Sequence, residues 1–450
     1  MELLTTKPHK VGAIRNGRRE LKVSSFCFGA YVYFLVDFFL HLSARIPGYG
    51  VIRPTLLLIL IISFSLFVQR DNLRDLNKDP MYKSIVILIA YIFLSLPFVE
   101  WPGSVIKNNL SGFVKAVVFF FFTAFIVDSE RRLKILISVF VTCQVIRVLE
   151  PLYLNVTQGY WGSKTHLGMG EFAQRLSGAP SDVINPNELG FVIATAFPFL
   201  YYFLWLGRWK AKLFFIFLAP ILLYALVLTM SRGAMIAMLV IAWFIFKDSK
   251  RKALLLVVGA ATLVTLWSVM SADQKDRYLS LVDSSAKQAA SAEGRINGMI
   301  NEFIIGLKRP LFGHGLGTTG EAKHHLTGRS KAAHNLYAEL LIEVGVVGLI
   351  IFMYYMLSIY RTLKINKSRV SLNDESSVFF VRLNKTFIAV FWMYAIYSIN
   401  YWGLSVYYWY MFGGMSIAFG FLLQNGRLKK SEDSLIGVPR IQRVISRGTS

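Results

Sequence analysis

The feature that most constrains this chain is a series of apolar blocks, each about 17 to 25 residues long, separated by short polar stretches. A helix rises about 1.5 Å per residue, so a block of this length matches the roughly 30 Å hydrocarbon core of a bilayer. Only 17% of the 450 residues are charged, whereas soluble proteins average about 25%. The pattern predicts a polytopic membrane protein and excludes a soluble enzyme, a disulfide-rich secreted domain and a disordered chain.

The blocks predict an all-α fold with about twelve transmembrane helices. An even number of spans would place both termini on the same side of the membrane. We expect the spans at residues 23–42, 51–68, 84–100, 112–127, 133–149, 189–206, 212–230, 233–246, 253–270, 335–360, 386–403 and 405–423.

The charges of the connecting loops predict the orientation of these spans. Lys and Arg gather in alternate short loops, for example at Arg131, Lys134, Lys250 and Arg251. Basic loops stay on the cytoplasmic side, so we expect both termini in the cytoplasm. The same bias accounts for the formal net charge of +23 without a nucleic-acid partner.

This topology divides the chain into five parts. The short cytoplasmic loops leave no room for a nucleotide-binding domain, and no Gly-rich nucleotide fingerprint is present, so ATP-driven transport is not expected. The expected parts are a cytoplasmic segment 1–22, nine spans over 23–270 with an outer loop at 150–188, a long structured outer loop at 271–334, three spans over 335–423 and a basic cytoplasmic tail 424–450.

The first candidate functional residue of the long outer loop is Arg295. Apolar residues recur at helical spacing from Ile296 to Leu307, which predicts a helix that either lies on the bilayer or packs over the bundle. A basic glycine turn follows, in which backbone N–H groups could hold an oxyanion, or the glycines could simply allow the chain to turn. Its candidate binding residues are Arg309, Gly313, Gly315 and Gly317.

The loop ends at His334, where the chain enters the tenth span. A histidine fixed at a helix entrance can exchange a proton near neutral pH. Asn335, Glu339 and Glu343 follow at a spacing that puts them on one helix face. Intramembrane carboxylates need a partner, and Arg147 near the outer end of the fifth span could supply it, either at a binding site or as a structural ion pair.

Arg232 lies in a very short outer turn between the seventh and eighth spans. Its guanidinium could bind phosphate oxygens bidentately, although a snorkelling arginine is the simpler interpretation of this residue alone. Taken together, Arg232, Arg295 and His334 put two cations and one titratable group at the outer face. That set suits a lipid-linked diphosphate donor and an acceptor hydroxyl.

Three stretches resemble the bacterial O-antigen ligase and polymerase superfamily. They are the turn at 231–234, the segment from 293 through the glycine turn at 309–317, and the segment at 334–349 with its His-Asn-Leu-Tyr start. Asn185-Pro186-Asn187-Glu188-Leu189-Gly190 is similar more weakly. The resemblance covers residues 185 to 355, approximately. No single stretch is specific for the family, but their order along the chain, together with the predicted topology, is.

The resemblance implies a GT-C-like fold in the bacterial inner membrane with a periplasmic active site. It implies a metal-independent, inverting glycosyltransferase without a cofactor. The donor would be an undecaprenyl-diphosphate-linked glycan, and the acceptor a lipid A core, a glycan or a protein. By the same resemblance, Arg232 and Arg295 would engage the donor diphosphate, and His334 would act as the base or in the acceptor site.

Two other classes of function remain open at this point. A flippase or transporter of a lipid-linked oligosaccharide would need charges at mid-membrane depth, whereas the candidates here gather at one face. A non-catalytic polysaccharide assembly subunit would not need Arg232, Arg295 or His334 for activity. The resemblance also leaves a ligase and a polymerase undistinguished.

Overall fold

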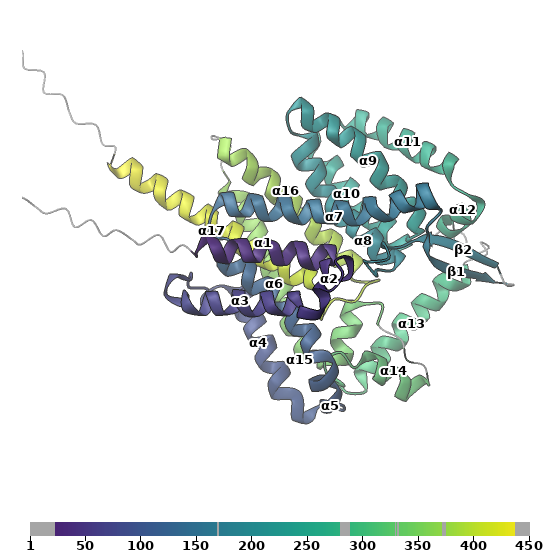
Figure 1. Ribbon diagram of the computed structural model, residues 1–450, viewed down its shortest axis with the longest axis horizontal. Coiled ribbons are helices and arrows are strands. Elements are labelled where there is room, and N and C mark those ends of the chain that lie inside the picture. The colour runs from purple at the N-terminus through teal and green to yellow at the C-terminus, as the bar shows by residue number, and fades with distance from the viewer. Residues whose placement is uncertain are drawn as a thin grey trace, which may run out of the picture.

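The structure, a computed structural model, describes residues 23–168, 171–279, 289–328, 330, 333–370 and 375–436. It is a helical bundle with one small β-hairpin (Figure 1). The first part of the chain forms α1 (Ser25–Leu40), α2 (Leu42–Arg45), α3 (Pro54–Val68), α4 (Pro80–Ser95), α5 (Pro102–Ser104), α6 (Leu110–Ile126) and α7 (Glu130–Gln158).

The remaining elements include the hairpin and the helices that carry most of the candidate site residues. In order, they are β1 (Gly162–Gly168), β2 (Glu171–Leu176), α8 (Pro186–Leu200), α9 (Trp209–Thr229), α10 (Arg232–Asp248), α11 (Lys252–Val269), α12 (Ala272–Leu279), α13 (Ala289–Leu307), α14 (Thr319–Thr327), α15 (Leu336–Arg369), α16 (Glu375–Tyr397) and α17 (Tyr407–Ile436).

The centre of the bundle is built from aromatic side chains and close helix contacts. Helix α17 packs along α6, where a Cβ added to Gly414 would lie 2.8 Å from the carbonyl oxygen of Phe120. A glycine therefore allows the two backbones to approach, as is usual between membrane helices. Tyr355 and Trp409 are fully buried beside this contact, and the Tyr355 hydroxyl donates to the Trp409 carbonyl at 2.9 Å.

The polytopic, mostly helical architecture expected from the sequence is confirmed in its coarse form. Each of the twelve predicted spans overlaps a helix, and eight of the described helices are long and apolar enough to cross a membrane. Helices α1 and α3 are apolar but shorter. The total of twelve spans stays a prediction.

Helix ends differ from the predicted spans where capping, which hydropathy does not detect, decides the boundary. Helix α7 continues to Gln158, nine residues beyond the predicted end at 149, and stops at Gly159, whose φ is 68°. Glycine adopts this left-handed conformation readily, so it terminates the helix. Helix α15 likewise continues to Arg369 rather than ending at 360.

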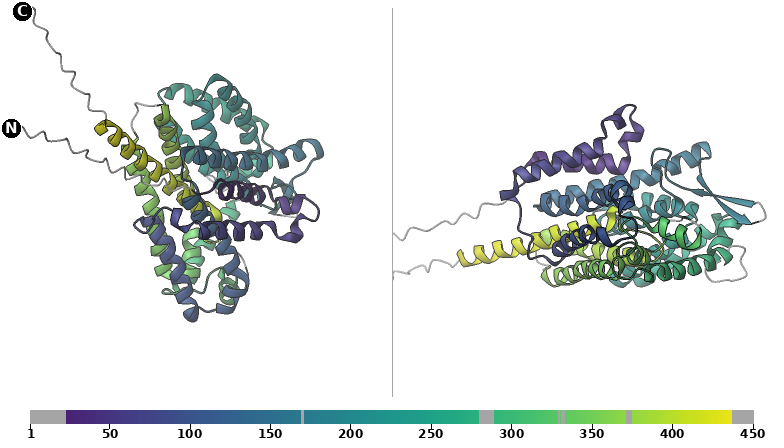
Figure 2. Two further views of the ribbon diagram at one scale, coloured as in Figure 1. Left: turned by 60° about the vertical axis from the view of Figure 1, so that its left-hand side comes forward. Right: turned by 90° about the horizontal axis from the view of Figure 1, so that it is seen from below.

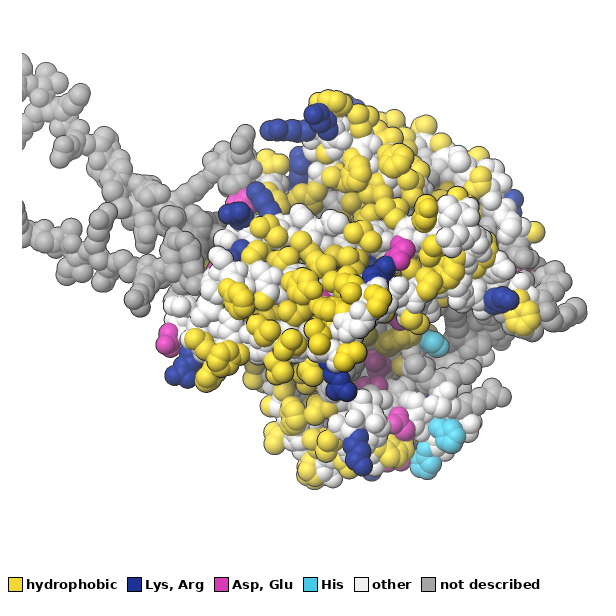
Figure 3. All heavy atoms as spheres, in the orientation of Figure 1, with side chains coloured by type: hydrophobic (Ala, Val, Ile, Leu, Met, Phe, Trp, Pro, Cys, Tyr) yellow, Lys and Arg dark blue, Asp and Glu magenta, His cyan; other side chains and the backbone are white. Residues whose placement is uncertain are grey.

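The surface of the bundle carries many large apolar side chains. Figure 3 shows hydrophobic side chains spread over the face that contains α1 and α3. In α11 no residue is buried, and Val257 and Val264 are each about two-thirds exposed, at 67% and 70%. An apolar surface of this extent is typical of helices that face lipid.

One end of the bundle carries the hairpin β1–β2 and the helices α12, α13 and α14, at the right of Figure 1. Seen from below in Figure 2, the hairpin lies at the end opposite to that at which α17 ends. The two strands pair antiparallel from Gly162 with Leu176. The sequence did not predict this hairpin within the outer segment 150–188. Because the loop charges predict that this end lies outside the cytoplasm, we call it the outer end.

Candidate functional site

The short turn that carries Arg232 is fixed by local capping. Met230 adopts a left-handed conformation (φ 50°) that ends α9, and the Ser231 hydroxyl accepts from the Ala234 N–H at 3.3 Å to cap α10. A Cβ added to Gly190 of α8 would lie 2.5 Å from the Ala234 Cβ. Helix α8 therefore packs directly on the start of α10, and Arg232, the first residue of α10, is only 4% exposed.

A second arginine, which the sequence analysis missed, supports this turn from the hairpin. Arg175 of β2 is buried, and its Nε donates to the Thr229 carbonyl at 2.8 Å. Its Nη2 donates to Asn187 Oδ1, at the start of α8, at 3.0 Å. Arg175 thus connects the hairpin, the end of α9 and the start of α8. Nothing in the spacing around Arg175 distinguishes it from an exposed strand residue.

His334 lies where α13, α14 and α15 converge. Its backbone N–H donates to Glu302 Oε1 of α13 at 3.3 Å, and the Glu302 carboxylate also forms an ion pair with Lys323 of α14. The His334 side chain is exposed, and its ring centroid lies 6.2 Å from that of Trp402. Glu302 therefore positions the backbone of His334 while the imidazole stays accessible.

The segment after α16 connects the Arg232 turn with the His334 entrance. A Cβ added to Gly233, next to Arg232, would lie 3.3 Å from the Tyr397 ring. The Leu336 N–H, two residues after His334, donates to the Ser398 carbonyl at 2.8 Å. The Tyr397 hydroxyl donates to the Asn187 carbonyl at 2.7 Å. The starts of α8, α10 and α15 thus meet around residues 397–402.

Arg295 lies on α13, but its side chain is outside the part of the chain that the structure describes. Helix α13 packs on α15 through a face different from the predicted apolar stripe. Glu302 and Ile305 are buried there, whereas Ile304 and Leu307 of the stripe are exposed. The helix therefore packs on the bundle and leaves part of its apolar stripe on the surface. That this stripe lies on the bilayer stays a prediction.

The glycine turn fills a break in α15 rather than presenting its N–H groups to the outside. At Gly345 the helix leaves helical geometry (φ 66°, ψ −172°). The His314 N–H donates to the Ile342 carbonyl at 2.7 Å, and the Gly315 N–H to the Glu343 carbonyl at 3.1 Å. The Val346 N–H donates to the Pro310 carbonyl at 2.6 Å. Backbone groups freed by the break are thus satisfied, as a membrane helix requires.

The remaining N–H groups of the turn also donate within the protein. Gly313 donates to the Arg309 carbonyl at 3.1 Å, and Gly317 donates to Glu343 Oε2 at 2.7 Å. The Thr319 hydroxyl donates to Glu343 Oε1 at 2.7 Å. The N–H groups of Gly313, Gly315 and Gly317 therefore donate within the protein and are not offered to an oxyanion in this structure. The sequence did not indicate this, because the break in α15 is not visible in the apolar pattern.

Replacement of Gly345 by alanine should destabilise the protein by at least about 2 kcal/mol. The residue has a left-handed φ, and a Cβ would lie 2.4 Å from the Leu311 carbonyl oxygen. The loss should appear as a lower thermal midpoint in fluorescence-detected size-exclusion chromatography. The control is Gly298→Ala on α13, where a Cβ would meet nothing within 4 Å. Equal midpoints for the two variants would contradict the assigned role of the break.

Arg309 belongs to a cluster of side chains around Glu100 and not to an anion site formed by the glycine N–H groups. Its Nε lies 4.0 Å from Glu100 Oε2, and His314 Nδ1 lies 2.5 Å from the same oxygen. His325 Nδ1 lies 3.2 Å from Glu100 Oε1. His314, to which the sequence gave no role, thus holds the glycine turn against the loop before α5. A pocket of about 500 Å³ lies beside this cluster, lined by Glu100, Trp101, Glu321, His324, His325 and Ser330.

Two other candidate binding residues have structural partners at the start of α15. The Asn335 side chain caps the helix, since its Oδ1 accepts from the Tyr337 and Ala338 N–H groups at 2.8 and 3.2 Å. Glu339 is buried, and its Oε2 accepts from the Gly403 N–H at 2.7 Å. These contacts fix α15 to the segment before α17, next to His334.

The predicted pairing of Arg147 with the carboxylates of α15 is wrong. Arg147 Nε and Nη2 instead donate to the two carboxylate oxygens of Asp182, at 2.6 and 3.0 Å. Asp182 is fully buried, and His41 Nδ1 lies 3.4 Å from it. Asp182 belongs to the loop before α8, and only the folded chain brings it beside α7. We therefore leave Arg147 out of the proposed binding residues.

A neighbouring ion pair holds α2 against α7. Arg45 Nη1 and Nη2 donate to the two carboxylate oxygens of Glu150, at 2.6 and 2.5 Å. These hydrogen bonds raise the pKa of Arg45, partly opposed by its burial. Two arginine–carboxylate contacts therefore join the outer part of α7 to α2 and to the loop before α8.

Removal of one member of the Arg147–Asp182 pair should cost about 3–5 kcal/mol, because the other charge would stay buried and unpaired. Arg147→Met and Asp182→Leu should each lower the thermal midpoint strongly. The double variant should recover most of the loss, since no buried charge remains. Additive losses in the double variant would show that the pair is not a coupled unit.

The described residues contain no group of three or more His, Cys, Asp and Glu side chains that could hold a metal ion.

The chain was compared with known protein families. Residues 217–353 match the family described as O-antigen ligase. The matched stretch runs from α9 into α15, and it contains Arg232, Arg295, the glycine turn and His334 but not Arg147. No curated protein matches the chain significantly.

Proposed function

Because residues 217–353 match the family described as O-antigen ligase, we propose that this chain is a membrane glycosyltransferase of that superfamily. It transfers a glycan from an undecaprenyl-diphosphate donor to a lipid A core, glycan or protein acceptor. The reaction takes place at the periplasmic face of the bacterial inner membrane, with both termini in the cytoplasm. Its product is a cell-surface polysaccharide such as O-antigen or exopolysaccharide.

The observation that carries this proposal is the convergence of two distant segments at the outer end. A Cβ added to Gly233 would lie 3.3 Å from the Tyr397 ring, and the Leu336 N–H donates to the carbonyl of Ser398, the next residue. Arg232 directly precedes Gly233, and His334 lies two residues before Leu336. Both lie within the stretch that matches the family. This convergence supports a site that combines a cation with a titratable imidazole.

The proposed reaction is a single displacement without a metal ion. His334 accepts the proton of the acceptor hydroxyl, and the hydroxyl oxygen attacks the anomeric carbon of the donor glycan. The bond from that carbon to the diphosphate oxygen breaks, and undecaprenyl diphosphate leaves with the electron pair. Attack opposite the leaving group inverts the anomeric configuration. Arg232 and Arg295 stabilise the negative charge that develops on the diphosphate.

Glu302 and Arg175 have positioning roles in this proposal. Glu302 holds the backbone of His334, and Arg175 holds the turn that leads into Arg232. Correct placement of reacting groups provides a large part of enzymatic rate enhancement. The contacts around residues 397–402 would therefore keep His334 and Arg232 at a constant distance and orientation.

The test is a transfer assay with purified protein in nanodiscs. The assay contains an undecaprenyl-diphosphate oligosaccharide, a mixture of candidate acceptors and a parallel reaction with EDTA. Release of undecaprenyl diphosphate together with an enlarged acceptor is expected, with and without EDTA. The enlarged product then identifies a ligase or a polymerase.

The same preparation distinguishes the two other classes of function. Lipid-linked oligosaccharide that crosses the bilayer of liposomes, without release of undecaprenyl diphosphate, would establish a flippase. No release and no movement, with a donor that a known transferase accepts, would favour a non-catalytic assembly subunit. Either result would overturn the proposed transfer reaction.

A further inference from the structure

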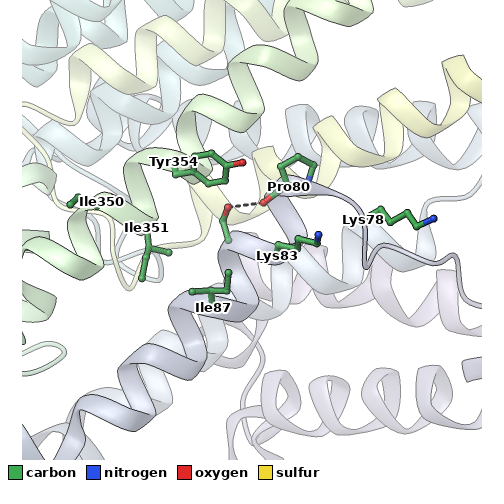
Figure 4. A pocket seen from close by; sticks show the side chains of 8 residues that line it. Lys78, Pro80, Lys83, Ile87, Ile350, Ile351 and Tyr354 are labelled. Carbon is green, nitrogen blue, oxygen red and sulfur yellow. Dashed lines mark hydrogen bonds between the residues drawn. The ribbon is translucent and has the colours of Figure 1, made fainter.

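A groove lies between α4 and α15, away from the candidate site. Figure 4 shows its side chains, which come from the start of α4 and the middle of α15. The groove has a volume of about 450 Å³. Its lining is Lys78, Pro80, Lys83, Ser84, Ile87, Ile350, Ile351 and Tyr354.

The lining changes from basic to apolar along the groove. Lys78 and Lys83 lie at the end where α4 begins, and Ile87 follows one turn further along α4. On α15, Ile350 and Ile351 lie one turn before Tyr354. Ile87 and Ile350 are 53% and 61% exposed, so their apolar surface is not covered by the protein. The groove is thus amphipathic along its length.

The acidic residue at this end, Asp79, does not line the groove. Asp79 caps α4, since its Oδ1 accepts from the Met81 and Tyr82 N–H groups at 2.8 and 3.3 Å. The Ser84 hydroxyl donates to the Pro80 carbonyl at 2.6 Å, which satisfies both groups within the groove wall. Lys78 and Lys83 are exposed and remain the charged groups of the lining.

We propose that this groove is a binding site for an anionic phospholipid. The lysines bind the phosphate and the anionic headgroup, and an acyl chain packs along Ile87, Ile350 and Ile351. Basic pockets between transmembrane helices suit such headgroups, and tyrosines such as Tyr354 are common where membrane helices meet the headgroup region. The expected orientation of the chain places the headgroup in the cytoplasmic leaflet.

The lipid would act on the helix pair that also holds the glycine turn. Tyr91 of α4 donates from its hydroxyl to the carbonyls of Leu311 and Val344, at 2.8 and 3.0 Å, beside the break in α15. The groove lies at the start of α4, and Tyr91 lies towards its other end. A lipid in the groove would therefore contact the same two helices and stabilise their packing. The binding site itself does not depend on the proposed transfer reaction.

Native mass spectrometry of the detergent-purified full chain tests the proposal. Phosphatidylglycerol and phosphatidylcholine with identical acyl chains are compared for retention on the protein. Each interfacial lysine contributes roughly a fivefold preference for an anionic lipid. In the double variant Lys78→Gln/Lys83→Gln, the preference for phosphatidylglycerol over phosphatidylcholine should therefore fall about 25-fold.

Two further variants separate the groove from general surface charge. Lys210→Gln/Lys212→Gln removes two lysines from the start of α9, which does not line the groove, and should leave the preference unchanged. Ile350→Trp fills the apolar part without a change of charge and should also release phosphatidylglycerol. Equal losses for both lysine pairs, retention in Ile350→Trp, or displacement by millimolar inorganic phosphate would overturn the proposal.

Discussion

Replacement of His334 by alanine should reduce glycan transfer by about 10²- to 10⁴-fold, the usual contribution of a general base. The imidazole is exposed at the outer end, whereas the backbone of His334 is held by Glu302. Removal of the side chain leaves that backbone contact in place. Membrane insertion and the thermal midpoint should therefore stay at wild-type values while the acceptor hydroxyl loses its proton acceptor.

The measurement is the initial rate of undecaprenyl diphosphate release in nanodiscs, with the protein level determined in each sample. His324→Ala is the matched control, since His324 is an exposed histidine of the same outer segment on α14. It should transfer at the wild-type rate. A His334→Ala variant with most of its activity would remove His334 from the mechanism, whatever the family resemblance implies.

Arg232→Lys should lower the transfer rate by about 10²-fold, similar to the loss of one preorganised donor at an oxyanion. Lysine keeps the positive charge but presents a point charge instead of a planar fork, so it cannot bind two phosphate oxygens bidentately. Arg232 is buried at the start of α10, and its main chain is fixed by the Ser231 cap. The substitution should therefore change the chemistry at this position more than the fold.

A comparison with Arg208→Lys checks this prediction. Arg208 directly precedes α9, at the other end of the helix that leads to the Arg232 turn. Both variants should insert and unfold like the wild type, and only Arg232→Lys should lose activity. Wild-type transfer rates in Arg232→Lys would indicate an arginine that merely snorkels. A lowered thermal midpoint in Arg232→Lys alone would instead assign the residue to packing.

The helical bundle was predictable because apolar length is a local property of the sequence. A block such as 189–206 must become a helix in lipid, since each backbone group needs an internal partner. The helix ends were less predictable because they depend on single residues such as Gly159, which stops α7 through its backbone conformation. Hydropathy averages over a window and cannot resolve such a position.

The candidate site was predictable in part. Met230 to Gly233 form the short turn that the sequence indicated, and His334 lies at the entrance to α15 as expected. Arg175 and Asp182 were missed, because each is defined by a partner distant in the chain. Arg175 reaches Thr229, and Asp182 pairs with Arg147. No spacing rule connects residues that only the packing of separate helices brings together.

The glycine turn shows most clearly where local inference ends. Its glycines predicted a tight turn, and Gly313, Gly315 and Gly317 all adopt positive φ. What the N–H groups bind was decided elsewhere, by the break at Gly345 that frees the carbonyls of Ile342 and Glu343. The sequence alone determined a basic, many-helix membrane chain with its candidate chemistry at one end. The tertiary structure decided which of those groups pair internally and which remain accessible, because buried polar groups take the partners that folding brings within reach.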